Sequence, residues 1–182
     1  MPAVAQQRWL LAMKEMQSLF PDSPQAERAR FLRARNESAS EAAAMLRAHL
    51  DWRAEHLPPP PGTPLFGNGL PPWILLNDSM GIQGLDGTPV VLTLAAMADA
   101  EVATPAQYAH ATAVLLDHFL PRDEEQLITM IVDVGGIHPG GTNSSVSKLY
   151  PIIRELSRVL APNFPERVKV ARGYACSRIS CI

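Results

Sequence analysis

The sequence predicts an α/β protein with a helical head at its N-terminus. Helical patterns occupy residues 1–57, a run rich in proline and glycine fills 58–72, and short apolar runs then alternate with helical patterns. Strands that alternate with helices indicate a layered α/β body. We therefore expect a helical head (1–57), an extended connector (58–72), an α/β domain (73–170) and a divergent tail (171–182).

The head contains two amphipathic patterns. Apolar side chains recur at helical spacing between residues 4 and 20, and Pro21 and Pro24 end this pattern. Ser38 and Glu41 fit a capping box that begins the second helix. One face of that helix carries Ala42, Met45, Leu46, His49, Leu50 and Arg53. Between the two helices lies a cluster of four arginines: Arg28, Arg30, Arg33 and Arg35.

The body begins with a predicted hairpin. The apolar runs at 73–76 and 89–95 flank a turn that contains glycine and aspartate. Thr104 and Pro105 then have the residue types preferred at the N-cap and the first position of a helix, and Pro121 ends that pattern. A strand pair followed by a helix is therefore expected here.

The second half of the body contains the predicted central strand. Residues 127–136 form a near-continuous apolar run with β-branched side chains, which is typical of a buried strand. A helical pattern covers 142–162, and Pro151 would fit its first turn or kink it. Residues 167–175 are expected to begin a further strand.

Composition narrows the class of protein. A hydrophobic fraction of 47% and a charged fraction of 19% are those of a globular chain, and a net charge of -2 does not favour nucleic-acid binding. Two cysteines near the C-terminus make no disulfide framework, and no apolar run approaches the roughly 18 residues of a membrane span. Arg8 and Lys14 interrupt the N-terminal apolar patch, whereas a signal peptide has an uninterrupted apolar region. We expect a soluble, cytoplasmic protein.

No pattern indicates catalysis, a metal or a cofactor. The segment "DVGGIHPGG" (133–141) follows a strand, but it lacks the Gly-Lys-Ser/Thr ending of a phosphate-binding P-loop. The histidines have no spacing that makes a ligand set, and no serine or cysteine lies in a nucleophile motif. We therefore expect a binding protein and not an enzyme, with no bound metal and no cofactor.

Five segments of the chain, in this order, resemble segments of one known protein family. They are "FLRARNESASEAAAMLRAHLDWR" (31–53), "LDGTPVV" (85–91), "LITMIVDVGGI" (127–137), "PIIREL" (151–156) and "NFPERV" (163–168). Together they resemble the CRAL-TRIO family of lipid-binding proteins. The resemblance implies a helical head and a mixed sheet with helices on one side. It also implies an apolar pocket that holds a phospholipid or another hydrophobic ligand.

The resemblance also implies individual site residues. Arg35 and Glu166 match positions near the inositol headgroup in phosphoinositide-binding members of the family. An arginine offers a fork of donors that suits phosphate oxygens, and a carboxylate accepts hydrogen bonds from ring hydroxyls. Ile128 and Met130 stand where members that bind phosphatidylcholine carry hydroxyl side chains. They are expected to line the pocket, without a choline-lipid headgroup site.

Other interpretations of these charged residues stay open. The arginine cluster is also compatible with a solvated surface, or with ion pairs to Glu27 and Glu37. Glu166 is equally compatible with an ordinary turn residue that pairs with Arg167 or Lys169.

Two functions follow from these observations. The resemblance stops after "PERVKV", so we expect a CRAL-TRIO domain that is incomplete at its C-terminal end. The first function is binding or transfer of a hydrophobic ligand, such as a phosphoinositide, with transient contact to membranes. The alternative is a truncated remnant that binds no lipid and acts as a protein-interaction module.

Overall fold

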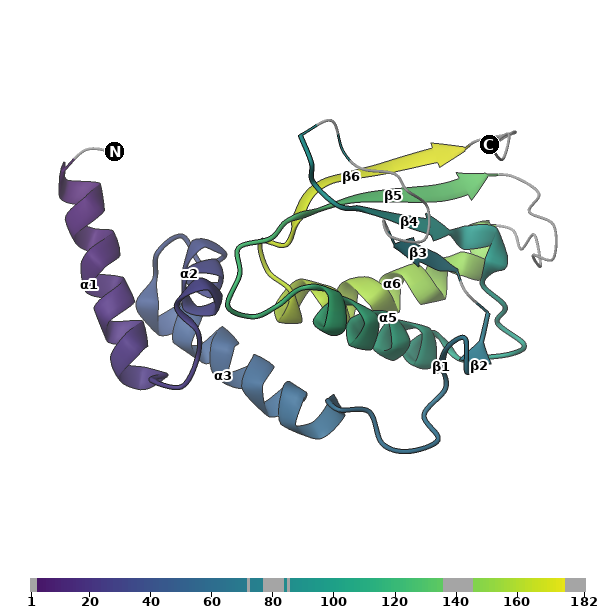
Figure 1. The fold of residues 1–182 in the computed structure, drawn as a ribbon, viewed down its shortest axis with the longest axis horizontal. Helices are drawn as coiled ribbons and strands as arrows, with labels where there is room; N and C mark the ends of the chain where they lie inside the picture. The colour runs from purple at the N-terminus through teal and green to yellow at the C-terminus, as the bar shows by residue number, and fades with distance from the viewer. Residues whose placement is uncertain (1–2, 72, 77–83, 85, 136–145, 176–182) are drawn as a thin grey trace.

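The head consists of three helices in the computed structural model, which describes residues 3–71, 73–76, 84, 86–135 and 146–175 (Figure 1). They are α1 (Ala3–Leu19), α2 (Gln25–Arg33) and α3 (Ala39–His56). The sequence pattern predicted α1 and α3, but it did not separate α2, the helix that carries three of the clustered arginines. The buried core of the head comprises Ala12, Met16, Phe20, Phe31, Leu32, Ala42, Ala43 and Leu46.

The capping box predicted at the start of α3 is wrong. Ser38 is the N-cap residue, but its side chain accepts no hydrogen bond from the first turn. Its Oγ lies 3.5 Å from the Oγ of Ser40, and only the Ser38 carbonyl oxygen bonds into the helix, accepting from the Ala42 N–H. Because the hydroxyl turns toward Ser40, it cannot reach the backbone N–H of Glu41.

The connector is not extended throughout: its first half has bends and a turn at 61–62, in which the Thr63 N–H donates to the Pro60 carbonyl oxygen. After α3 ends, two short strands, β1 (Leu65–Phe66) and β2 (Gly69–Leu70), pair with each other. Gly67 and Gly69 have φ values of 79° and 89°, which glycine adopts without steric cost. Leu65, Phe66 and Leu70 pack with the core of the body, so the second half of the connector belongs to the body.

The body is built on a four-stranded mixed sheet in the order β3-β4-β5-β6. β3 (Ile74–Leu76) and β4 (Val90–Leu94) pair antiparallel, as the predicted hairpin requires. β5 (Ile128–Gly135) lies between β4 and β6 and is parallel to both, which confirms the predicted central strand. β6 (Val168–Ala175) continues beyond 170, so residues 171–175 of the predicted tail belong to the sheet.

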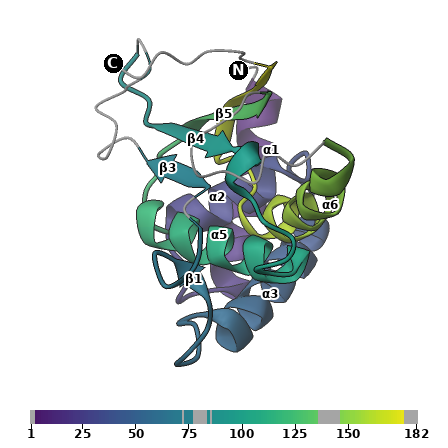
Figure 2. The ribbon, with the colours of Figure 1, turned by 90° about the vertical axis from the view of Figure 1, so that its right-hand side faces the viewer.

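Two helices cover one face of this sheet (Figures 1 and 2). α5 (Pro105–Phe119) begins as predicted, with a capping box between Thr104 and Gln107. α6 (Val146–Asn163) contains Pro151 within the helix, beyond its first turn. A short 3₁₀ turn, η1 (Ala95–Met97), follows β4. Among the described residues, no helix lies on the opposite face of the sheet, and no helix is both long and apolar enough to cross a membrane.

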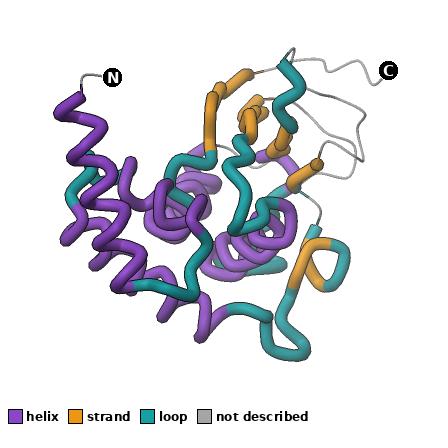
Figure 3. Tube along the Cα trace, turned by 60° about the vertical axis from the view of Figure 1, so that its left-hand side comes forward, coloured by secondary structure: helices purple, strands orange, loops and turns teal. Residues whose placement is uncertain are grey.

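The head and the body have separate hydrophobic cores. The core of the body contains Trp73, Val91, Tyr108, Leu116, Ile128 and Ile152 among others, and no residue of it belongs to the core of the head. Figure 3 shows the three head helices gathered beside the body. The two parts are therefore held together by the contacts of their facing surfaces, which also form the candidate site.

Candidate functional site

The first clustered arginine stabilises the head internally. Arg28 is buried and donates from Nη1 to the carbonyl oxygens of Phe20, at 3.0 Å, and of Ser23. Its Nη2 contacts the amide oxygen of Gln17. Its two Nη groups thus have the partners that a buried guanidinium requires, whereas its Nε is buried without a hydrogen-bond partner among the described residues. Arg28 therefore fixes the turn between α1 and α2.

Two further arginines join the head to the segment that follows α5. Arg30 is also buried, and its Nη2 donates to the Arg122 carbonyl oxygen at 3.0 Å while its Nη1 contacts that of Glu124. Burial, together with the positive charge of Arg167, lowers the pKa of Arg30 to about 10, so it remains charged at neutral pH. Arg33 is exposed and forms an ion pair with Glu125 at 3.2 Å.

Glu27 lies at the centre of the junction between head and body, and its side chain is 1% exposed. Its carboxylate accepts from Arg122 Nε at 2.7 Å and Nη2 at 2.6 Å, and Nε2 of His49 lies 3.5 Å away. Burial alone would raise the pKa of Glu27, but the hydrogen bonds and charges of His49 and Arg122 lower it to about 2. The suggested ion pair between Glu27 and the arginine cluster is therefore replaced by one with Arg122.

Three more contacts align α3 with the helices of the body. His49 Nδ1 donates to Oδ1 of Asn163 on α6 at 3.0 Å, and the Asn163 amide donates to the Val159 carbonyl oxygen at 2.8 Å. The Trp52 ring meets the Phe164 ring edge-on, with centroids 6.4 Å apart. Arg53 forms an ion pair with Asp117 on α5. The separation and orientation of α3 and α6 are thus set mainly by polar and aromatic contacts.

Arg35 and Glu166 line the same open hollow at this junction. The hollow has a volume of about 410 Å³. It lies between the loop that follows α2 and the C-terminal end of α6. Its remaining lining consists of small and apolar side chains: Ala34, Met45, Ala161, Pro162 and Pro165. The two residues that the family resemblance assigns to a headgroup thus line one site, which we call the Arg35–Glu166 hollow.

Neither side chain is bound to the partners that the sequence suggested for it. Arg167 donates to backbone carbonyl oxygens, including those of Glu124 and Gln126 at 2.9 Å each, and the Lys169 ammonium contacts Asp86. Glu37 forms its ion pair with Arg8 at 2.7 Å.

Within the described part of the chain, the Arg35 guanidinium forms no ion pair, and its hydrogen bond is to the Ala34 carbonyl oxygen at 3.3 Å. Its exposed donors are therefore available to a ligand.

Residues with an unusual backbone conformation occur at Glu166 and in the segment that follows Arg35. Asn36, Glu37 and Glu166 are the described residues other than glycine with positive φ, at 49°, 65° and 57°. This left-handed conformation costs roughly 1 to 2 kcal/mol for a residue with a side chain. Such residues are over-represented at binding sites, where the surrounding structure holds them in place. Here they lie directly beside Arg35 and at Glu166 itself.

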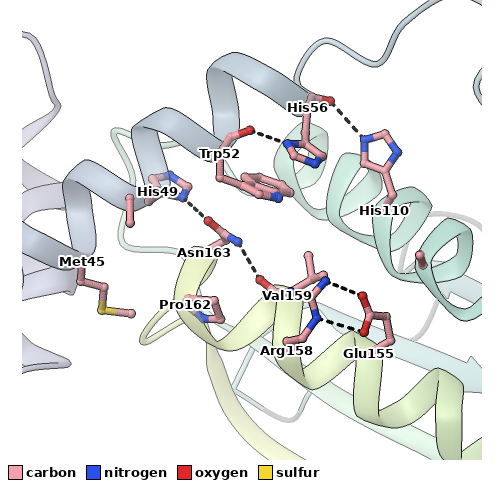
Figure 4. Close-up of a pocket in the computed structure, with 12 residues that line it drawn as sticks. Met45, His49, Trp52, His56, His110, Glu155, Arg158, Val159, Pro162 and Asn163 are labelled. Carbon is pink, nitrogen blue, oxygen red and sulfur yellow. Dashed lines mark hydrogen bonds and ion pairs between the residues drawn. The ribbon is translucent and has the colours of Figure 1, made fainter.

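A second hollow of about 400 Å³ adjoins the first (Figure 4). It lies between α3, α5 and α6 and is lined by Met45, Ala48, His49, Trp52, His56, Ala106, His110, Glu155, Arg158, Val159, Pro162 and Asn163. Met45 and Pro162 also line the Arg35–Glu166 hollow. The two hollows therefore adjoin along the boundary of α3 and α6, and we refer to them together as the groove. The spacing of the histidines gave no signal of this second, α3–α5–α6 hollow, because they come from two helices that only the tertiary fold brings together.

Ile128 and Met130 lie elsewhere. Ile128 is fully buried, and Met130 packs against the same core between the sheet and its covering helices. Side chains alternate along a strand, so Thr129 and Ile131 lie on the opposite face. Neither Ile128 nor Met130 lines the two hollows of the groove. Their role as pocket residues stays a prediction.

The glycine-rich segment at the end of β5 is described only in part. Most of the segment 133–141 lies outside the described residues. Among the residues that are described, no group of three or more histidine, cysteine, aspartate or glutamate side chains is positioned to hold a metal ion.

No protein-family model matches the chain, and no curated protein matches it either.

Proposed function

We propose that this chain binds a phospholipid with a phosphorylated inositol headgroup, and that the headgroup lies in the Arg35–Glu166 hollow. The observation that carries the proposal is that these two side chains, which come from the head and from the body, line one hollow. They are also the two residues that the CRAL-TRIO resemblance assigns to the headgroup.

The chemistry of the hollow suits such a ligand. A guanidinium can donate two parallel hydrogen bonds to a phosphate group, and a carboxylate can accept hydrogen bonds from the hydroxyl groups of the inositol ring. The rest of the wall is apolar or small, with Met45, Pro162 and Pro165 beside the two charges. The phosphate of such a ligand would therefore bind Arg35 and its hydroxyl groups would bind Glu166. Its apolar part would contact the apolar wall.

Lipid extraction from vesicles tests the proposal. The chain is incubated with vesicles of phosphatidylcholine that contain a minor fraction of a phosphoinositide, and the lipids bound to the recovered protein are identified by mass spectrometry. We expect the phosphoinositide to be enriched, and Arg35→Ala combined with Glu166→Ala to weaken its binding roughly tenfold or more. The control is Arg33→Ala. Arg33 is an exposed arginine two residues before Arg35, and it does not line the hollow.

Two outcomes would overturn this function. One is that the protein extracts no lipid, and the other is that the double substitution weakens neutral and inositol lipids equally. A loss as large in Arg33→Ala would show that general positive charge, and not the hollow, attracts the lipid.

One observation favours the second candidate, a protein-interaction module. Thr129 and Ile131 alternate with core residues of β5 and lie on the sheet face that no described helix covers. A chain with this function would extract no lipid, and Ile131→Asp would abolish partner binding at this face. Size-exclusion chromatography with light scattering would detect such a complex.

A further inference from the structure

We propose that the α3–α5–α6 hollow holds the apolar chain of the ligand whose headgroup lies beside Arg35 and Glu166. This inference rests on the proposed function and adds the path of the chain. The lipid would lie in the groove between head and body, along α3 and α6, and would contact both parts at once.

The first argument is that the two hollows are neighbours. They share Met45 on α3 and Pro162 on α6, so they adjoin at these two side chains. Figure 4 shows Met45 and Pro162 at one end of the second hollow and His110 toward the other. The headgroup and the apolar chain of one amphiphile would therefore occupy neighbouring hollows.

The second argument is the apolar surface in this hollow. Its lining includes half-buried Trp52 and Val159 and exposed Ala48 and Ala106, which water covers in the absence of a ligand. Removing such surface from water is favourable by about 25 cal/mol for each Å². An extended hydrocarbon chain is the part of an amphiphile that gains from this burial.

The third argument is that the polar lining residues already have partners within the protein. The bonds are His49 to Asn163, Asn163 to Val159, His56 to Trp52, His110 to His56, and Arg158 to Glu155. A buried polar group is costly mainly when it is left without a hydrogen bond. An apolar chain can therefore enter without removing the hydrogen bonds of these side chains.

These same bonds argue against a second charged group in this hollow. The carboxylate of Glu155 and the guanidinium of Arg158 neutralise each other at 2.6 Å, and the Arg158 side chain is 71% exposed at the rim. The Trp52 ring already stacks on the His56 ring, with centroids 5.2 Å apart, and the His49 ring lies 6.3 Å away. The hollow therefore offers a polar ligand neither strong ionic binding nor a free stacking position between the histidine rings.

Substitutions that fill the hollow provide the main test. Ala48→Trp places a large side chain in the α3–α5–α6 hollow, and Ala44→Trp places the same side chain on an exposed position of α3 that lines neither hollow. The ligands are a long-chain phosphoinositide and the matching inositol phosphate without acyl chains, and dissociation constants are measured for both. We expect Ala48→Trp to weaken the long-chain lipid about tenfold or more, to leave the chain-free headgroup unchanged, and Ala44→Trp to change neither.

The outcomes separate this inference from the proposed function. If the chain-free headgroup binds in a manner that depends on Arg35, but Ala48→Trp leaves the long-chain lipid unaffected, the chain path is wrong and the headgroup site stands. If Ala48→Trp weakens the long-chain lipid while Arg35→Ala has no effect, the headgroup site is wrong and the chain path stands. If neither ligand binds the unsubstituted protein, both are wrong.

Fluorescence quenching gives an independent measurement of the same path. A phosphoinositide with bromine atoms on its acyl chain quenches a nearby tryptophan, and Trp52 is the tryptophan that lines this hollow. Trp9 lies on α1 and Trp73 in the core of the body. We expect quenching in the unsubstituted protein and its loss in Trp52→Phe. Quenching that is unchanged in Trp52→Phe would overturn the inference.

Discussion

Glu27 of α2 and Arg122 of the segment after α5 form a two-pronged ion pair across the junction of head and body, with N–O distances of 2.7 and 2.6 Å. The head and body have separate hydrophobic cores, so this pair and its neighbours fix how α3 lies against α6. The shape of the groove between those helices depends on that arrangement. Relative motion is the usual expectation for two parts that meet through polar contacts.

The first prediction concerns acid stability. The pKa of Glu27 is about 2 in the folded chain against 4.5 ordinarily. A lowered pKa contributes stability that is present above about pH 4.5 and is lost as the pH falls toward 2, because the unfolded chain binds the proton first. The shift corresponds to about 3 kcal/mol in the free energy of unfolding. Glu27→Gln should be less stable at pH 7 and should lose less stability between pH 4.5 and 2.

Urea unfolding at a series of pH values measures this difference. Glu125→Gln is the matched control, because Glu125 also pairs with an arginine across the junction but is largely exposed. An exposed ion pair contributes at most about 1 kcal/mol. Parallel acid profiles for Glu27→Gln and the unsubstituted chain would contradict the prediction.

The second prediction concerns the buried face of α3. Leu46 is 0% exposed in the core of the head, whereas Arg47 is exposed and lies over the Phe20 ring at 5.5 Å. Leu46→Asp should reduce the free energy of unfolding by at least about 3 kcal/mol, since it removes packing and buries a carboxylate. Arg47→Asp should cost about 1 kcal/mol or less. Thermal unfolding of both variants provides the comparison, and equal losses would mean that the helix face is assigned wrongly.

The third prediction separates backbone strain from binding at Glu166. Its φ of 57° suits glycine, whereas alanine keeps the steric cost of the left-handed conformation. Glu166→Gly should therefore be more stable than Glu166→Ala, by about 1 kcal/mol once the greater freedom of glycine in the unfolded chain is included. Both substitutions remove the carboxylate and should weaken phosphoinositide binding equally. A glycine variant no more stable than the alanine variant in thermal unfolding would refute this.

The fourth prediction concerns the order of proteolysis. β5 is hydrogen-bonded on both sides within the sheet, whereas residues 57–64 connect the two parts without regular structure. A protease of broad specificity cleaves a chain segment that has unfolded locally. Local unfolding is easiest where few buried contacts must break. Among the described residues, the first cleavage should therefore fall around Gly62, where the bonds of this segment do not precede proline, and it should release the head from the body. Mass spectrometry of the fragments would reveal an earlier cut in β5.

The sequence alone determined the kinds of elements and much of their order. Hydrophobic period distinguishes helix from strand locally, which is why the hairpin, the central strand and the helix after Thr104 follow from a few neighbouring residues each. The same local information was insufficient at Ser38, where the pattern of a capping box was present but the hydroxyl bonds elsewhere.

Only the tertiary structure decided what the charged residues do. The four arginines of the cluster look alike in sequence, yet Arg28 and Arg30 are buried against backbone carbonyl oxygens while Arg35 is exposed beside Glu166. The partner of Arg30 lies in a segment more than ninety residues away. Such a pairing depends on how the two separately formed cores meet, because local periodicity specifies which side of an element faces inward but not which distant group it will find there.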